Sequence, residues 1–137
     1  MLLGVGYLSA FAWGHRPYET TTLAAAFEAL LPEEADAVAL AAGVEAFVRD
    51  GDPVLAGQLN AALTVLEHLG GAGPIGFRRF SRLSKEARLE TIESWRRSRV
   101  GTKRQIGDAV RRTALFTWYS QPESWVAVGY DGPWVKR

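Results

Sequence analysis

The chain has 137 residues, a length that suits one domain with a hydrophobic core and makes two domains an unfavoured reading. Of these residues 47% are apolar and 23% charged, a composition typical of a globular protein. It contains no cysteine, which excludes disulfides, thiolate nucleophiles, iron–sulfur clusters and cysteine-ligated zinc. The net charge of +1 hides an asymmetry, because residues 1–68 hold nine Asp and Glu against two Lys and Arg, whereas residues 69–137 hold six against 14. The two halves can attract each other within the fold, or the basic half can meet an acidic partner or phosphates.

The N-terminal segment, residues 1–19, begins with an apolar run that ends at Trp13. A helix of that length is too short to cross a bilayer, so we expect no membrane span. The first basic residue, Arg16, follows the apolar run, which is not the order of a secretory signal. We expect an apolar arm docked on a single helical domain, residues 20–137. A targeting remnant and a membrane-surface anchor are the alternatives.

Three amphipathic helices are predicted in the acidic half. The threonines at 20–22 are candidate N-caps for the first helix, which Pro32 ends. Asp36 is placed to cap a second helix that stops near Gly51. The pair at residues 52–53, Asp followed by Pro, has the form of an N-cap with Pro at the next position and starts a third helix. The second helix carries Leu40, Val44, Phe47 and Val48 on one side, and the third carries Leu55, Leu59, Leu63, Leu66 and Leu69.

Residues 70–76 form the clearest loop, with four glycines and Pro74. Residues 71–76 match the G-x-G-x-x-G spacing of dinucleotide-binding loops. That motif works at the start of a helix that follows a strand, whereas here the preceding residues read as a helix and Pro74 removes a backbone donor. We therefore expect a connection between helices.

The basic half is also predicted to be helical. A short turn around Phe80 precedes a charged helix that Ser84 caps and that runs to about Ser98, with Leu89, Ile92 and Trp95 along one stripe. Residues 101–102, Gly-Thr, are predicted to separate this helix from the next one and to cap the latter, which runs to about Tyr119. Residues 120–123 fit a capping box before a brief helix around Trp125. The alternation of apolar and polar residues that is typical of β-strands is nearly absent. The prediction is an all-α fold, a single compact helical domain of about five to six helices with an irregular, aromatic-rich C-terminal tail.

No pattern in the sequence predicts catalysis, cofactor binding or metal binding. His15 and His68 lie far apart and lack the spacing that would place ligands on one helix face. Acid–base work by the acids at 33–34 would need a concave, partly desolvated setting, and nothing near them in the sequence indicates one. No serine lies in a G-x-S-x-G elbow. We therefore expect this chain to be no enzyme and to hold no catalytic, cofactor-binding or metal-binding residues.

The strongest functional features are the arginine-rich helices and the aromatic tail. Residues 78–112 hold 12 Lys and Arg against four acids, and residues 118–134 hold five of the 15 aromatic residues. The basic face can bind nucleic acid, remain solvated or internally paired, or contact a protein. The aromatic rings need a surface to lie against, which is either the chain's own helices or another protein.

Several short motifs occur in a characteristic order: the helix ending in Leu31-Pro32, GVEAFV at 43–48, FSRL at 80–83, Arg88-Leu89, WRRS at 95–98, YSQP at 119–122, Trp125, and GYDGPW at 129–134. This order, over roughly residues 20–135, resembles the gluconate 2-dehydrogenase subunit 3 family. Its members are small helical subunits of flavin-dependent dehydrogenases whose large subunit is a glucose-methanol-choline type oxidoreductase.

The resemblance implies a non-catalytic accessory subunit that binds the large flavoprotein and stabilises or matures it. FAD would belong to the partner, which would act on an alcohol, a sugar or a steroid-like compound, and the resemblance also admits a cytochrome c subunit. Exported members carry a twin-arginine signal, which residues 1–13 lack, so localisation stays open between the cytoplasm and a periplasm reached with the partner. A basic helical nucleic-acid-binding protein is the alternative function, although we expect no nucleic acid to bind.

Arginine and tryptophan are the residue types most enriched at binding hot spots, and they define the predicted interface. Internal packing is the alternative for Trp95 and Trp118, which lie inside predicted helices, and it also stays open for the aromatic residues of the tail, Trp125, Tyr130 and Trp134. The expected partner contacts are Arg96, Arg97, Arg111 and Arg112 for charge, and Trp118, Tyr119, Trp125, Tyr130 and Trp134 for apolar area.

Overall fold

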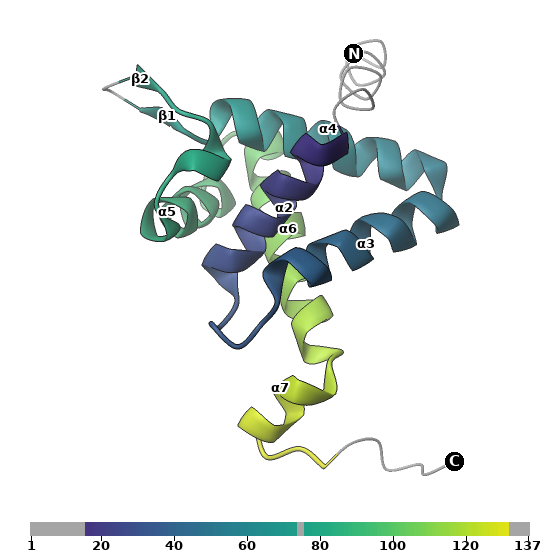
Figure 1. Ribbon diagram of the computed structural model, residues 1–137. Helices are drawn as coiled ribbons and strands as arrows, with labels where there is room; N and C mark the ends of the chain where they lie inside the picture. Colours follow the sequence, from purple (N-terminus) through teal and green to yellow (C-terminus); the bar gives the residue numbers. More distant parts are fainter. Residues whose placement is uncertain (1–15, 74–75, 132–137) are drawn as a thin grey trace.

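The computed structural model describes residues 16–73 and 76–131, and in this part of the chain it shows six α-helices (Figure 1). The all-α prediction is confirmed. The helices are α2 (Arg16–Leu30), α3 (Ala37–Gly51), α4 (Pro53–Leu69), α5 (Lys85–Arg96), α6 (Gly101–Tyr119) and α7 (Pro122–Ala127). Between α4 and α5 lie two short strands, β1 (Ala72–Gly73) and β2 (Gly76–Phe77), and a 3₁₀ turn, η1 (Phe80–Arg82).

Helix α2 lies at the centre and contacts α3, α4, α5, α6 and η1 (Figure 1). Leu23, Phe27 and Leu31 recur every four residues and belong to one hydrophobic cluster, which α3, α4 and α6 complete with Ala41, Leu63, Ala114 and Trp118. Ala25 and Ala26 belong to a second cluster, in which small α2 side chains let Phe80, Ile92, Trp95 and Val110 pack close to the α2 backbone. Both clusters therefore depend on α2.

Three of the predicted caps are confirmed. The Asp36 carboxylate accepts a hydrogen bond from the Ala39 amide at 3.0 Å. Asp52 accepts from the amides of residues 54 and 55 at 2.9 and 3.2 Å, and Pro53 occupies the first helical position. The Ser84 hydroxyl accepts from the Ala87 amide at 3.1 Å. Each cap satisfies amides that the first helical turn leaves without partners.

Three other predicted caps are wrong. The threonines at 20–22 lie inside α2, and the Thr22 hydroxyl donates to Glu67. Helix α6 begins after Val100 with no side-chain cap, so Thr102 does not cap it. Ser120 ends α6 rather than capping α7, since its hydroxyl donates to the Phe116 carbonyl at 2.7 Å. A hydroxyl can bond a preceding carbonyl or a distant side chain as well as a following amide, and local sequence does not decide between them.

The structure also departs from the prediction of an N-terminal arm. Residues 16–19, which we assigned to it, are the first residues of α2. Residues 1–15 lie outside the described part of the chain.

The glycine-rich segment folds back on itself as a hairpin, a small sheet that the sequence did not predict. Ala72 pairs with Phe77 and Gly73 with Gly76 in antiparallel register. Gly71 is required here, because a Cβ atom at that position would lie 1.8 Å from the Arg78 carbonyl oxygen. A helix precedes the segment, as the sequence context predicted.

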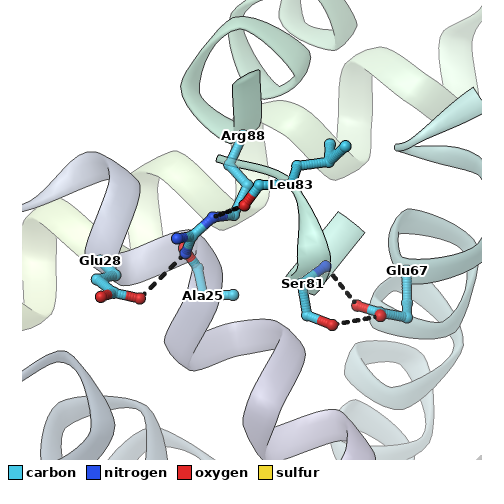
Figure 2. Close-up of polar contacts among 6 residues, drawn as sticks. All are labelled: Ala25, Glu28, Glu67, Ser81, Leu83 and Arg88. Carbon is cyan, nitrogen blue, oxygen red and sulfur yellow. Dashed lines mark hydrogen bonds and ion pairs between the residues drawn. The ribbon is translucent and has the colours of Figure 1, made fainter. Parts of the chain in front are cut away.

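Two charged side chains enter the interior and join distant elements (Figure 2). Glu67 of α4 is fully buried and accepts hydrogen bonds from the Thr22 hydroxyl at 2.8 Å and from the Ser81 hydroxyl and amide at 2.6 and 3.2 Å. Arg88 of α5 is 8% exposed and donates to the carbonyls of Ala25 and Leu83 and to Glu28.

The buried stripe of α5 differs from the prediction in one residue. Ile92 and Trp95 are buried as expected, but Arg88 takes the place that the sequence assigned to Leu89, which is 39% exposed. The guanidinium is tolerated there because each of its bonds goes to a carbonyl or a carboxylate.

Candidate partner-binding surface

The predicted charged contacts fall into two groups. Arg96 and Arg111 are engaged with acids of their own half of the chain. Arg96 Nε donates to Asp108 Oδ1 at 3.0 Å, and this bond joins α5 to α6. Within α5, Arg96 Nη1 donates to Glu93 Oε2 at 2.9 Å. Arg111 Nε lies 3.7 Å from Glu93 Oε1. The hydrogen bond to Asp108, with the charge of Glu93 as a further cause, raises the pKa of Arg96 above its ordinary value.

Arg97 and Arg112 are exposed and lie on different parts of the surface. Arg97 is the C-cap residue that follows α5, and it lines an open cavity of about 1030 Å³ beside the hairpin. Arg112 lies on α6 and lines a groove against α3. The structure thus does not bring the four predicted arginines together. An ion pair between Arg88 and Glu28, with 3.1 Å between Nη1 and Oε2, links the basic half to the acidic half.

The predicted aromatic contacts are distributed between core and surface. Trp118 is 9% exposed and packs in the first hydrophobic cluster, whereas its neighbour Tyr119 is 52% exposed. Trp125 is half-buried, and its Nε1 donates to the Tyr119 carbonyl at 2.9 Å. Trp134 lies outside the described residues. The described tail therefore offers Tyr119, Trp125 and Tyr130 to the surface.

A Schellman motif orders the end of α7. The Tyr130 amide donates to the Trp125 carbonyl at 2.9 Å and the Gly129 amide to the Val126 carbonyl at 3.3 Å, with Gly129 at φ 69°. The hydrophobic contact that accompanies such motifs is the edge-to-face pair of Trp125 and Tyr130, whose ring centroids lie 5.5 Å apart. Val126 and Val128, which lie between Trp125 and Tyr130 in the sequence, stay exposed. The described tail is thus ordered beyond the end of α6 and still presents apolar side chains.

The largest departure from the predicted burial is an apolar groove between α3 and the C-terminal half of α6, which we call the α3–α6 groove. Its volume is about 840 Å³. It stays open because α3 packs mainly on α2 and α4 and touches α6 only lightly. Helix α3 contributes Ala39, Leu40, Gly43, Val44, Phe47 and Val48. The C-terminal half of α6 and the two residues that join it to α7 contribute Arg112, Thr113, Phe116, Thr117, Ser120 and Gln121.

Helical periodicity sorts these residues into a floor and two rims. On α3, Leu40, Val44 and Val48 recur every four residues and form the partly buried floor, which continues into the first cluster. Ala39, Gly43 and Phe47 form one exposed rim. On α6, the opposite rim consists of Arg112, Phe116 and Ser120.

A phenylalanine stands on each rim of the groove. Phe47 is 79% exposed and Phe116 is 77% exposed. The sequence placed Phe47 on the same side as Leu40, Val44 and Val48, and no prediction assigned Phe116 a role. Periodicity alone assigns Phe47 and Val48 to one face, so it could not separate a rim residue from a floor residue.

The groove carries little charge. Arg112 is the one charged residue among those that line it, and it makes no ion pair with any described residue. An uncharged apolar trough with a single cation on its rim suits a protein segment better than a phosphate backbone, which needs several cations along its length.

Comparisons of the chain with models of known protein families, with curated proteins and with solved structures found no match. In the described ranges, no three or more His, Asp or Glu side chains are grouped so that they could hold a metal ion. None of the described helices combines the length and the apolar character that crossing a membrane requires.

Proposed function

We propose that this chain is a non-catalytic accessory subunit that binds the large subunit of an FAD-dependent dehydrogenase of the glucose-methanol-choline type and stabilises or matures it. The observation that carries the proposal is the α3–α6 groove, with Phe47 and Phe116 exposed on its two rims. Large aromatic side chains gathered on one open surface are typical of a site where another protein binds.

The position of the tail supports the same surface as the site where the partner binds. Ser120 and Gln121 line the groove and lead directly into α7, so the exposed Val126 and Tyr130 continue from its end. The groove, with Arg112 on its rim, and the exposed apolar side chains that follow it in the chain both offer a partner apolar contact. The resemblance of the motif order to the small dehydrogenase subunits supports the identity of that partner.

The charge distribution argues against the nucleic-acid alternative. Three of the arginines that suggested it are engaged within the protein: Arg88 is buried, and Arg96 and Arg111 pair with acids. Fewer cations are then free to release counterions from a phosphate backbone than the sequence suggested.

The proposal is tested by purifying the tagged chain from its native host. We expect a yellow complex that contains a large flavoprotein. In the double variant Phe47→Ser with Phe116→Ser, recovery of flavin should fall by about tenfold or more, because the two large aromatic contacts on the rims are lost. Val54→Ser is the matched control, since Val54 is 70% exposed but lies outside the groove. A colourless chain loaded with nucleic acid, or a solitary chain that turns over a substrate, would contradict the proposal.

A further inference from the structure

We infer that the α3–α6 groove receives an amphipathic α-helix of the partner subunit, with apolar side chains against the groove and an Asp or Glu beside Arg112. This inference rests on the proposed function and adds which structural element of the partner is bound and where.

The walls of the groove select a helix over an extended segment. Both walls are α-helices, α3 and α6, whose backbone amides are already bonded within each helix, so they offer no open strand edge. An extended peptide would bring unpaired backbone groups against apolar side chains, which is costly. A helix satisfies its own backbone and presents an apolar stripe to the floor formed by Leu40, Val44 and Val48.

The rims define where the largest side chain of that helix would enter. Ala39 and Gly43 are small, so the α3 rim is low along two turns until Phe47. A Cβ atom placed on Gly43 meets no atom within 4 Å, so the space beside it is open. From Ala39 to Val48 the groove extends about 14 Å along α3, which matches roughly two and a half turns of a bound helix.

The charge of Arg112 indicates that the bound helix carries an acidic residue. Its guanidinium is exposed on the α6 rim without an ion-pair partner among the described residues, so a carboxylate on the bound helix would complete it. Residues 1–15 of this chain contain no Asp or Glu, so the chain's own apolar arm would leave Arg112 unpaired. A partner helix with an acidic residue fits both the apolar floor and the rim.

A steric block tests the site. Gly43→Trp places a large side chain on the exposed rim of the groove, where a built Cβ atom meets no other atom within 4 Å. We expect flavoprotein recovered with this variant to fall about tenfold or more. Gly51→Trp is the matched control, because Gly51 also has no atom within 4 Å of a built Cβ, lies on the same helix and does not line the groove. Circular dichroism and thermal unfolding of both variants should show the wild-type fold.

The occupant is identified by crosslinking. The chain has no cysteine, so Gly43→Cys gives it a single attachment point for a thiol-directed photocrosslinker, which is attached to this chain before it is combined with the flavoprotein. We expect the crosslinked peptide to come from the flavoprotein, with apolar residues at helical spacing and an Asp or Glu. Arg112→Glu should weaken the complex more than Arg104→Glu, which changes an exposed arginine outside the groove.

The outcomes separate this inference from the proposed function. If a yellow complex forms but Gly43→Trp leaves it intact, the function stands and the groove inference is overturned. Crosslinks to a second copy of this chain, or to its own residues 1–15, overturn the inference as well. If the wild-type chain recovers no flavoprotein, both proposals fail.

Discussion

Glu67 shows how one side chain can hold three elements together. Both of its carboxylate oxygens accept hydrogen bonds, from Thr22 on α2 and from the hydroxyl and amide of Ser81 on η1. The bond from the Ser81 amide satisfies a donor at the start of η1, which has no side-chain cap of its own. A buried acceptor with three donors therefore fixes the position of η1 on α2 and α4, and the sequence offers no sign of it, because the partners are 14 and 45 residues away.

At this scale we predict that Glu67→Ala destabilises the fold by about 3 kcal/mol, since it leaves buried donors unsatisfied and opens a cavity. Thr22→Val removes one donor and should cost less, about 1 kcal/mol. Urea unfolding followed by circular dichroism measures both. Glu33→Ala, an exposed acid between α2 and α3, is the control and should change stability by less than about 0.5 kcal/mol. Equal stability of Glu67→Ala and Glu33→Ala would mean that the buried contacts contribute nothing.

The tail offers a second prediction for a single residue. Gly129 has φ 69°, a conformation that other residues adopt at a cost of about 1 kcal/mol. We expect Gly129→Ala to open the Schellman motif and speed hydrogen exchange of the Tyr130 amide, which bonds the Trp125 carbonyl. Exchange of amides in the α2 core should stay at the wild-type rate. An unchanged Tyr130 amide would show that the turn does not depend on glycine.

At the scale of elements, local signals located the helices to within a few residues, although only three of the six predicted caps are confirmed, and they did not decide which faces the helices bury. Asp36, Asp52 and Ser84 were correct because an N-cap acts on amides two or three residues away. The burial of Arg88 in place of Leu89 was missed, because it depends on carbonyls of residues 25 and 83 that folding brings to it. A stripe of apolar residues indicates a helix but does not reveal what covers it.

Two glycines within helices should respond to alanine in opposite directions. A Cβ atom on Gly107 would lie 2.9 Å from the Arg96 amide nitrogen, where α5 and α6 approach closely, so Gly107→Ala should destabilise by about 1–3 kcal/mol despite its better helix propensity. Gly43→Ala meets no atom within 4 Å and should stabilise by about 0.5–1 kcal/mol. Thermal unfolding of the two variants measures the difference. Stabilisation by both substitutions would show that α5 and α6 can separate to admit the added methyl group.

For the whole molecule, the open groove predicts how the isolated chain behaves. We expect the wild-type chain, purified without a partner, to self-associate as its concentration rises, because Phe47 and Phe116 are exposed together. Phe47→Ser with Phe116→Ser should reduce this association without lowering the midpoint of thermal unfolding, since neither side chain is buried. Light scattering across a concentration series measures it, with Val54→Ser as the control. A wild-type chain that stays monomeric throughout would weaken the case for an interface at the groove.

The sequence by itself determined that this protein is helical, where most of the helices begin and end, and that the glycine-rich segment follows a helix, because capping, helical periodicity and glycine or proline breaks act over a few residues. Only the tertiary structure decided that Trp118 is buried, that Arg96 and Arg111 are paired, and that Phe47, Phe116 and Arg112 surround an open groove. Whether a side chain is covered depends on elements far away in the chain, and no local pattern carries that information.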